Sequence, residues 1–144
     1  MTEPIFLDTN VLVYLYDRRD PRKQKQAEKL LFETLSQKNV VISSQVVVEF
    51  CNVMLTKKGT IMRDTDLKEV LLHVLNPKLA HMPSIDFYDR SVQLFVKGSI
   101  NFYDALIVQA AIDLNCDVIY SEDLQNGQKF GKLEVINPFK ERPN

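Results

Sequence analysis

Short apolar runs alternate along this chain with longer segments of mixed polarity. Four runs rich in Ile, Val, Leu and Phe are only three or four residues long and lack the apolar–polar alternation of a half-exposed strand. Such runs are typical of strands that are buried on both faces. The predicted strands are residues 5–7, 40–42, 117–120 and 134–136.

Between these runs, apolar residues recur every three or four positions, which predicts helices. Pro21 is expected to open one of them, while Gly59 and Gly98 follow the ends of two others. Asp66 and Glu69 have the spacing of a capping box before an apolar segment that Pro77 ends. The predicted helices are residues 11–16, 21–37, 44–57, 67–76, 84–97 and 103–115.

Alternating strands and helices predict an α/β fold with a mainly parallel sheet. The 144 residues correspond to about one domain, and neither a repeat nor a Pro- or Ser-rich linker divides them, so residues 1–144 are expected to form a single domain. No stretch has the roughly 18 apolar residues of a membrane span, and the first residues lack a signal pattern. We therefore expect no membrane association and a cytoplasmic location. Cys51 and Cys116 are expected to be free thiols, as in a reducing compartment.

The net charge of −1 differs from that of proteins that coat nucleic acid. The basic residues are unevenly distributed, however, and a dense group occupies residues 18–29. This group could form a basic rim beside an acidic pocket, or it could be a solvated helix face. Its members are Arg18, Arg19, Arg22, Lys23, Lys25 and Lys29.

Four acidic residues lie at or near the boundaries of apolar elements. Asp8 directly follows the first strand, and Asp123 follows the strand that ends at residue 120. Glu49 lies about two turns into the helix that follows the second strand. Asp104 opens the helix that precedes the third strand. Ligands of such sheets bind at the carboxyl ends of the strands, so the four carboxylates are expected to converge there.

A pocket of four carboxylates repels itself unless a divalent cation binds there. Oxygen ligands favour Mg²⁺ or Mn²⁺, and the two histidines, His73 and His81, lie in another part of the chain, which disfavours zinc. Taken singly, each acid has a simpler explanation. Asp8 and Asp104 could cap helices, Asp123 could belong to a turn, and Glu49 could face solvent.

The joint pattern resembles the PIN-domain nucleases over nearly the whole chain. The segments that carry the resemblance are LDTNVL, VVVEF, YDALIVQAA and SEDLQNG, and within the family the chain is most similar to VapC-type toxins of toxin–antitoxin operons. The resemblance implies a PIN-like three-layer α/β/α fold with a central, mainly parallel sheet of four to five short strands. It also implies a metal-dependent endoribonuclease whose products carry 5′-phosphate and 3′-hydroxyl ends.

The resemblance assigns catalytic and Mg²⁺- or Mn²⁺-binding roles to Asp8, Glu49, Asp104 and Asp123. The fourth motif has the form Ser/Thr, any residue, Asp, which Ser121 and Asp123 satisfy. Glu122 is the second choice for this acid. Supporting roles fall to Thr9, Asn10, Ser121 and Glu122.

The resemblance further implies an RNA substrate, a small antitoxin partner and a homodimer. Arg18, Arg19, Arg22, Lys23 and Lys25 are the candidates for guiding the RNA backbone. Two alternatives stay open: a PIN nuclease that acts on DNA or in RNA processing, and a non-catalytic PIN-fold binding module. A phosphatase of the haloacid dehalogenase type is a weaker alternative, because it needs a second Asp where this chain has Asn10.

Overall fold

The computed structural model describes residues 3–35, 39–56 and 61–140. Within these ranges, six strands form one sheet in the order β3-β2-β1-β4-β6-β5. Every neighbouring pair is parallel except β5 and β6, which form an antiparallel hairpin. The strands are β1 (Ile5–Leu7), β2 (Val40–Ser43), β3 (Leu79–His81), β4 (Val118–Tyr120), β5 (Lys129–Phe130) and β6 (Leu133–Ile136).

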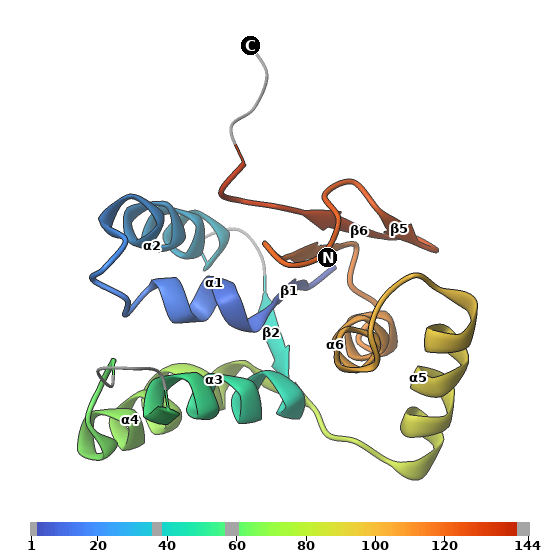
Figure 1. Cartoon of the computed structure of the whole chain (residues 1–144), viewed down its shortest axis with the longest axis horizontal. Coiled ribbons are helices and arrows are strands. Elements are labelled where there is room, and N and C mark those ends of the chain that lie inside the picture. The colour runs from blue at the N-terminus through green and yellow to red at the C-terminus, as the bar shows by residue number, and fades with distance from the viewer. Residues whose placement is uncertain (1–2, 36–38, 57–60, 141–144) are drawn as a thin grey trace.

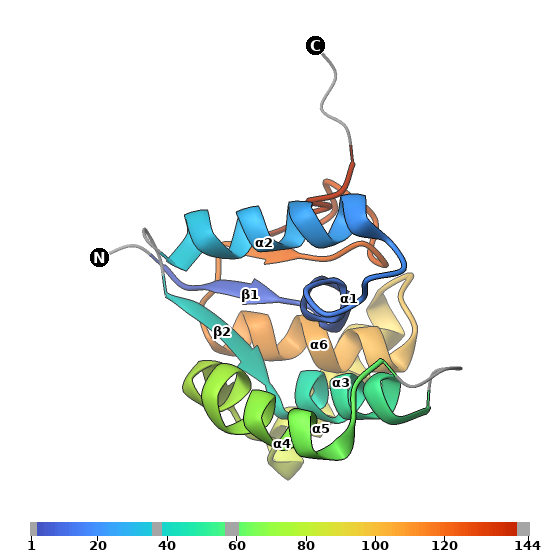
Figure 2. The same ribbon diagram turned by 90° about the vertical axis from the view of Figure 1, so that its left-hand side faces the viewer.

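Helices cover both faces of this sheet. Figure 2 shows α2 above β1 and β2, with α3 and α6 below them, and Figure 1 shows α5 outside α6. The predicted three-layer α/β/α arrangement is confirmed. The helices are α1 (Thr9–Tyr14), α2 (Pro21–Leu35), α3 (Ser44–Thr56), α4 (Asp64–Val70), α5 (Ile85–Lys97) and α6 (Phe102–Asp113), and α4 continues into a π-helical turn, η1 (Leu71–Leu75), and a 3₁₀ turn, η2 (Asn76–Lys78).

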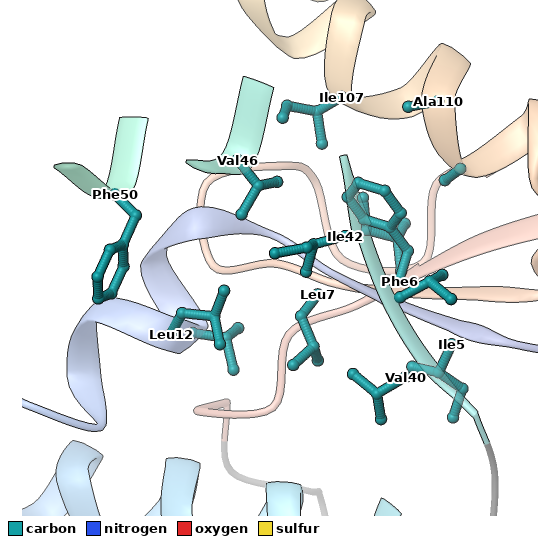
Figure 3. Packing of buried hydrophobic residues seen from close by; sticks show 14 of the residues in the cluster. Ile5, Phe6, Leu7, Leu12, Val40, Ile42, Val46, Phe50, Ile107 and Ala110 are labelled. Carbon is teal, nitrogen blue, oxygen red and sulfur yellow. The ribbon is translucent and has the colours of Figure 1, made fainter. Parts of the chain in front are cut away.

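The core lies between β1, β2 and the helices on either side. All residues of β1 and β2 are buried, as expected for central strands that helices cover on both faces. Seven consecutive residues of α6, from Ala105 to Ala111, are also buried, because this helix lies between the sheet and α5. Figure 3 shows side chains of β1 and β2 packed with residues of α1, α3 and α6 in a single cluster.

The four predicted strands are present, each within one residue of its predicted bounds. Two further strands, β3 and β5, were not predicted. The residues of β3 are only partly buried or exposed, and β5 has two residues, so neither carries a clear apolar run. Residues 36–37 and 57, the predicted ends of two helices, lie outside the described residues, as does Gly59.

Two predictions of helix starts were wrong. The predicted capping box at Asp66 does not open its helix, because α4 begins two residues earlier, after Arg63. Asp64 and Asp66 both fall in the first turn, where carboxylates favour the positive end of the helix dipole. Helix α1 also begins two residues earlier than predicted, with Asp8 as its N-cap.

The prediction of free thiols is confirmed for Cys51 and Cys116. Among the described residues, no helix combines the length and apolar character that crossing a membrane requires.

Asn101 caps α6, and its side chain accepts a hydrogen bond from the backbone N–H of Asp104 over 2.8 Å. We predict that Asn101→Ala lowers the free energy of unfolding by about 1 kcal/mol, the usual value of such a cap. Urea denaturation followed by circular dichroism measures this change. Gln125→Ala, at an exposed position outside the helices, is the control and should change stability by less than about 0.5 kcal/mol. Equal stability of Asn101→Ala and the parent protein would contradict the assigned cap.

Candidate active site

The carboxyl ends of β1 and β4 meet at one edge of the sheet. The two strands are parallel, with Leu7 opposite Tyr120, so the residues that follow them are adjacent. The backbone N–H of Asp8 donates to the carbonyl of Tyr120 over 3.0 Å, and Ser121 Oγ donates to Asp8 Oδ2 over 2.8 Å. Ser121 is fully buried and also accepts from the N–H of Leu124. The first and fourth sequence motifs are therefore joined at this edge.

A pocket of about 400 Å³ opens at this edge. All four carboxylates that the sequence singled out line it, although they come from positions 8 to 123 of the chain. The wall of the pocket is formed by residues at the edge of the sheet and by the helices α1, α3 and α6. The lining residues are Asp8, Thr9, Asn10, Val13, Tyr14, Glu49, Asn52, Val53, Asp104, Glu122 and Asp123.

Asp8 is the most deeply buried of these acids, with 4% of its surface exposed. The pKa of its carboxyl group is raised to about 7, chiefly by burial and to a smaller extent by the negative charges of Glu49 and Asp123. Hydrogen bonds from Ser121 and from the backbone N–H of Thr9 oppose these effects. The ionised form of Asp8 is thus costly without a positive charge nearby.

Glu49 and Asp104 face this pocket from two different helices. Thr9 Oγ1 donates to Glu49 Oε2 over 2.7 Å, and Gln45 Nε2 donates to Oε1 over 3.3 Å, so both oxygens of Glu49 are held. Asp104 lies in the first turn of α6. Partial burial raises the pKa of its carboxyl group, and the charges of Asp123 and Glu49 add to this effect. The carboxylates are therefore close enough to repel one another.

Asn10 links the fourth motif to α1. Its Oδ1 accepts from the backbone N–H of Glu122 over 3.1 Å, and its Nδ2 donates to Asp123 Oδ2 over 3.1 Å. A single amide thus fixes the backbone of one acid and the side chain of the next.

The two adjacent acids of this turn have different partners. Glu122 Oε1 accepts from the hydroxyl of Tyr14 over 2.7 Å, and Glu122 Oε2 forms an ion pair with Lys23. The ammonium group of Lys23 also lies 4.9 Å from the ring centroid of Tyr14 and 5.8 Å from that of Phe139. Burial and the bond to Glu122 raise the pKa of Tyr14, and the same carboxylate raises the pKa of Lys23.

The structure separates the basic residues that the sequence grouped together. Lys23 lies beside the acidic pocket through its contact with Glu122. Arg18 and Arg19 line a different cavity of about 630 Å³, and Arg19 is held there by Asp17 at 2.8 Å. Lys25 is exposed on α2.

The pocket fits a hard divalent cation by the chemistry of its donors. Its polar atoms are carboxylate, amide and hydroxyl oxygens and the amide nitrogens of Asn side chains, and neither His nor Cys lines it. Neighbouring carboxylates raise the pKa values of Asp8 and Asp104, and a bound cation would oppose this effect by neutralising their negative charge.

The model of the PIN domain matches residues 5–128. The chain belongs to the PIN-domain family. This confirms the resemblance inferred from the four motifs, and the match spans all four acidic residues. No curated protein matches the chain.

Solved structures with the same fold include toxins and toxin–antitoxin complexes. VapC20 of Mycobacterium tuberculosis, a toxin that cleaves the sarcin–ricin loop, is 18% identical, with a TM-score of 0.64 over 83% of this PIN domain and 89% of that chain. FitAcB of Neisseria gonorrhoeae is 19% identical, with a TM-score of 0.64 over 94% and 98%. A toxin–antitoxin complex of Klebsiella pneumoniae is 20% identical, with a TM-score of 0.63 over 93% and 97%.

Four residues that line the pocket of this PIN domain were not predicted from the sequence. Val13 and Tyr14 lie three and four positions after Asn10, and Asn52 and Val53 lie three and four positions after Glu49. Residues with these spacings share one face of a helix, so the spacing from each motif could have identified them. The contact between Tyr14, Lys23 and Glu122 joins segments far apart in the sequence, and no sequence pattern indicated it.

The buried carboxyl group of Asp8 predicts a specific pH dependence of stability. Its pKa is about 7 in the folded PIN domain against 3.8 for an unperturbed Asp, so the folded state holds this proton more tightly. Stability from this group is therefore present below about pH 4 and is lost as the pH rises to about 7. The change in the free energy of unfolding that Asp8→Asn causes in the metal-free protein should therefore be more favourable at pH 8 than at pH 4. The difference should be at most about 4 kcal/mol, since each pKa unit corresponds to about 1.4 kcal/mol.

Urea denaturation in EDTA at both pH values measures this difference. Asp89→Asn makes the same chemical change at an exposed position of α5 and should show no such pH dependence. The assigned burial effect is wrong if Asp8→Asn changes stability equally at the two pH values.

Proposed function

We propose that this PIN domain is a metal-dependent endoribonuclease and the toxin of a toxin–antitoxin pair. The observation that carries the proposal is the convergence of Asp8, Glu49, Asp104 and Asp123 on one pocket at the carboxyl ends of the parallel strands. Family membership and the toxin structures that share the fold support it.

The cation is Mg²⁺ or Mn²⁺, bound through a small number of direct carboxylate ligands. In residues 3–35, 39–56 and 61–140, no three Asp, Glu, His or Cys side chains lie close enough together to enclose an ion. Mg²⁺ does not need such a cage, because it keeps several waters and commonly takes one or two carboxylates from the protein. We assign Asp8 and Asp104 as the principal ligands.

When bound, the cation activates water and neutralises negative charge on the phosphate. Glu49 and Asp123 complete the negative pocket and orient the attacking water. Thr9 and Gln45 hold Glu49, and Asn10 holds Asp123, so both carboxylates are fixed before the substrate arrives. Attack on phosphorus with departure of the 3′-oxygen leaves a 5′-phosphate and a 3′-hydroxyl.

The RNA backbone is guided by the basic residues between positions 18 and 25, of which Lys23 lies beside the pocket. Arg18 and Lys25 are exposed, and the side chain of Arg19 is 52% exposed although it pairs with Asp17. The remaining two members of the group, Arg22 and Lys23, lie on α2, and Lys23 forms an ion pair with Glu122 at the edge of the pocket. Such cations bind phosphates and supply affinity that does not depend on sequence.

The protein forms a homodimer and binds a small antitoxin. Solved structures with this fold include complexes with antitoxins, which supports the second partner. An apolar stripe on α5 supports association of either kind, because its side chains are 41% to 85% exposed and recur at helical spacing. The stripe consists of Ile85, Tyr88, Val92, Phe95 and Val96.

The nuclease assignment predicts that cleavage requires both the cation and Asp104. Purified protein, free of any antitoxin, is incubated with total cellular RNA and matched DNA in Mg²⁺, Mn²⁺ or EDTA. Discrete RNA fragments with 5′-phosphate ends are expected in Mg²⁺ or Mn²⁺, and EDTA should abolish them. Asp104→Asn should lower the cleavage rate by at least about 100-fold, the scale of losing a principal catalytic interaction.

Asp89→Asn is the matched control, because it makes the same change at an exposed position of α5 and should cleave at the parent rate. DNA cleavage at the same rate as RNA would favour the alternative PIN nuclease. Intact RNA in every metal-containing reaction would refute the nuclease assignment.

Backbone guidance predicts a change in the salt dependence of RNA binding. In the inactive Asp104→Asn protein, the further substitutions Arg18→Gln and Lys25→Gln should reduce the slope of log K against log salt by about 2, one for each phosphate contact. Fluorescence anisotropy of a labelled RNA measures the slope. Lys97→Gln with Lys129→Gln removes the same charge from exposed positions on α5 and β5 and should leave the slope unchanged. Equal slopes in both double variants would exclude the assigned surface.

A further inference from the structure

Two consecutive acids, Glu122 and Asp123, line the same pocket, yet their side chains are held differently. Both carboxylate oxygens of Glu122 are engaged, one by the Tyr14 hydroxyl and the other by the Lys23 ammonium group. One oxygen of Asp123 accepts from the Asn10 amide. Asp123 is exposed to solvent, whereas the side chain of Glu122 is only 24% exposed.

The partners of Glu122 are themselves fixed. Tyr14 packs edge-on against Phe139 with ring centroids 4.9 Å apart, and Lys23 lies near both rings. Lys23 also donates to the Tyr14 hydroxyl over 3.2 Å, so the three polar groups form a closed cluster. An oxygen that already accepts from a cation or a hydroxyl gains less by binding a metal ion, because it must first lose that partner.

We propose that Tyr14 and Lys23 are positioning residues that hold the Glu122 carboxylate away from the metal ion, so that Asp123 is the acid this turn offers to the cation. The inference rests on the proposed function. It assigns to Lys23 a role in setting the charge and the ligands of the pocket, in addition to any contact with RNA.

Release of Glu122 should tighten metal binding and impair catalysis. Lys23→Met removes the cation that neutralises Glu122, and one uncompensated negative charge near a divalent ion should tighten binding about threefold in moderate salt. Tyr14→Phe leaves the net charge unchanged and removes only the O–H donor, so any tightening it causes reflects release of the oxygen. The double variant frees both oxygens and should bind Mn²⁺ at least about tenfold more tightly, a gain we attribute to a new direct ligand.

Isothermal titration of the folded variants with Mn²⁺, in the absence of RNA, tests this directly. Adding Glu122→Gln to the double variant should return the affinity to within about twofold of the parent value, because the added carboxylate is then gone. Cleavage by Lys23→Met should be slower, and Lys23→Met with Glu122→Gln should recover it. In the Mn²⁺ titration, which contains no RNA, Lys25→Met removes the same charge from an exposed site on α2 and is the control for charge alone.

The outcomes separate this inference from the proposed function. If the parent protein binds Mn²⁺ but neither Lys23→Met nor the double variant binds it more tightly, the inference is overturned and the nuclease assignment stands. The same holds if Lys25→Met tightens Mn²⁺ binding as much as Lys23→Met does. Persistent loss of cleavage in Lys23→Met with Glu122→Gln, together with an unchanged Mn²⁺ affinity in Lys23→Met, would mean that Lys23 acts on RNA alone, which also overturns the inference. A parent protein that does not bind Mn²⁺ would overturn the proposed metal site and this inference together.

Discussion

One carboxyl group, buried at the end of the central strand β1, constrains how the candidate site is assembled. Asp8 lies where β1 gives way to α1, and burial alone would make its charged form unfavourable. Three features offset this cost: the N–H of Thr9, the hydroxyl of Ser121 and the parallel pairing of β1 with β4 that brings Ser121 there. The same pairing joins the beginning of the sequence to its fourth motif. The pairing of β1 with β4 therefore both offsets the cost of burying Asp8 and brings the first and fourth motifs together.

Side chains that are uncharged organise the other acids around this point. Thr9 holds Glu49, Asn10 holds the turn of Glu122 and Asp123, and Asn101 caps the helix that carries Asp104. Thr9 and Asn10 restrict carboxylates without neutralising them, and Asn101 fixes the backbone at Asp104. The negative potential of the pocket is thus preserved while the positions of its charges are set, which is the preorganisation that binding a cation and a phosphodiester requires.

The sequence allowed prediction of what local periodicity encodes. Four strands and the convergence of the four acids on one pocket were predicted because buried runs, helical spacing and residues at strand ends are local signals. The three-layer arrangement was implied by the resemblance to PIN domains. Strand β3 was missed because its residues are only partly buried, and the start of α4 was misplaced because Asp66 reads equally well as a cap and as a first-turn acid. The different surroundings of Glu122 and Asp123 were out of reach, since Tyr14 and Lys23 lie 108 and 99 positions away from Glu122.

The order of strands in the sheet has a consequence for synthesis of the chain. Strand β4 lies between β1 and β6, and the backbone N–H of Ser121 donates to the carbonyl of Ile136 in the last strand. Asp8 is synthesised before the turn that completes its surroundings, and that turn is anchored by a residue 128 positions further along the chain, Ile136. A nascent chain that has not yet been extended past Ile136 therefore lacks the assembled pocket, and any chemistry of this pocket begins only after this strand has been translated.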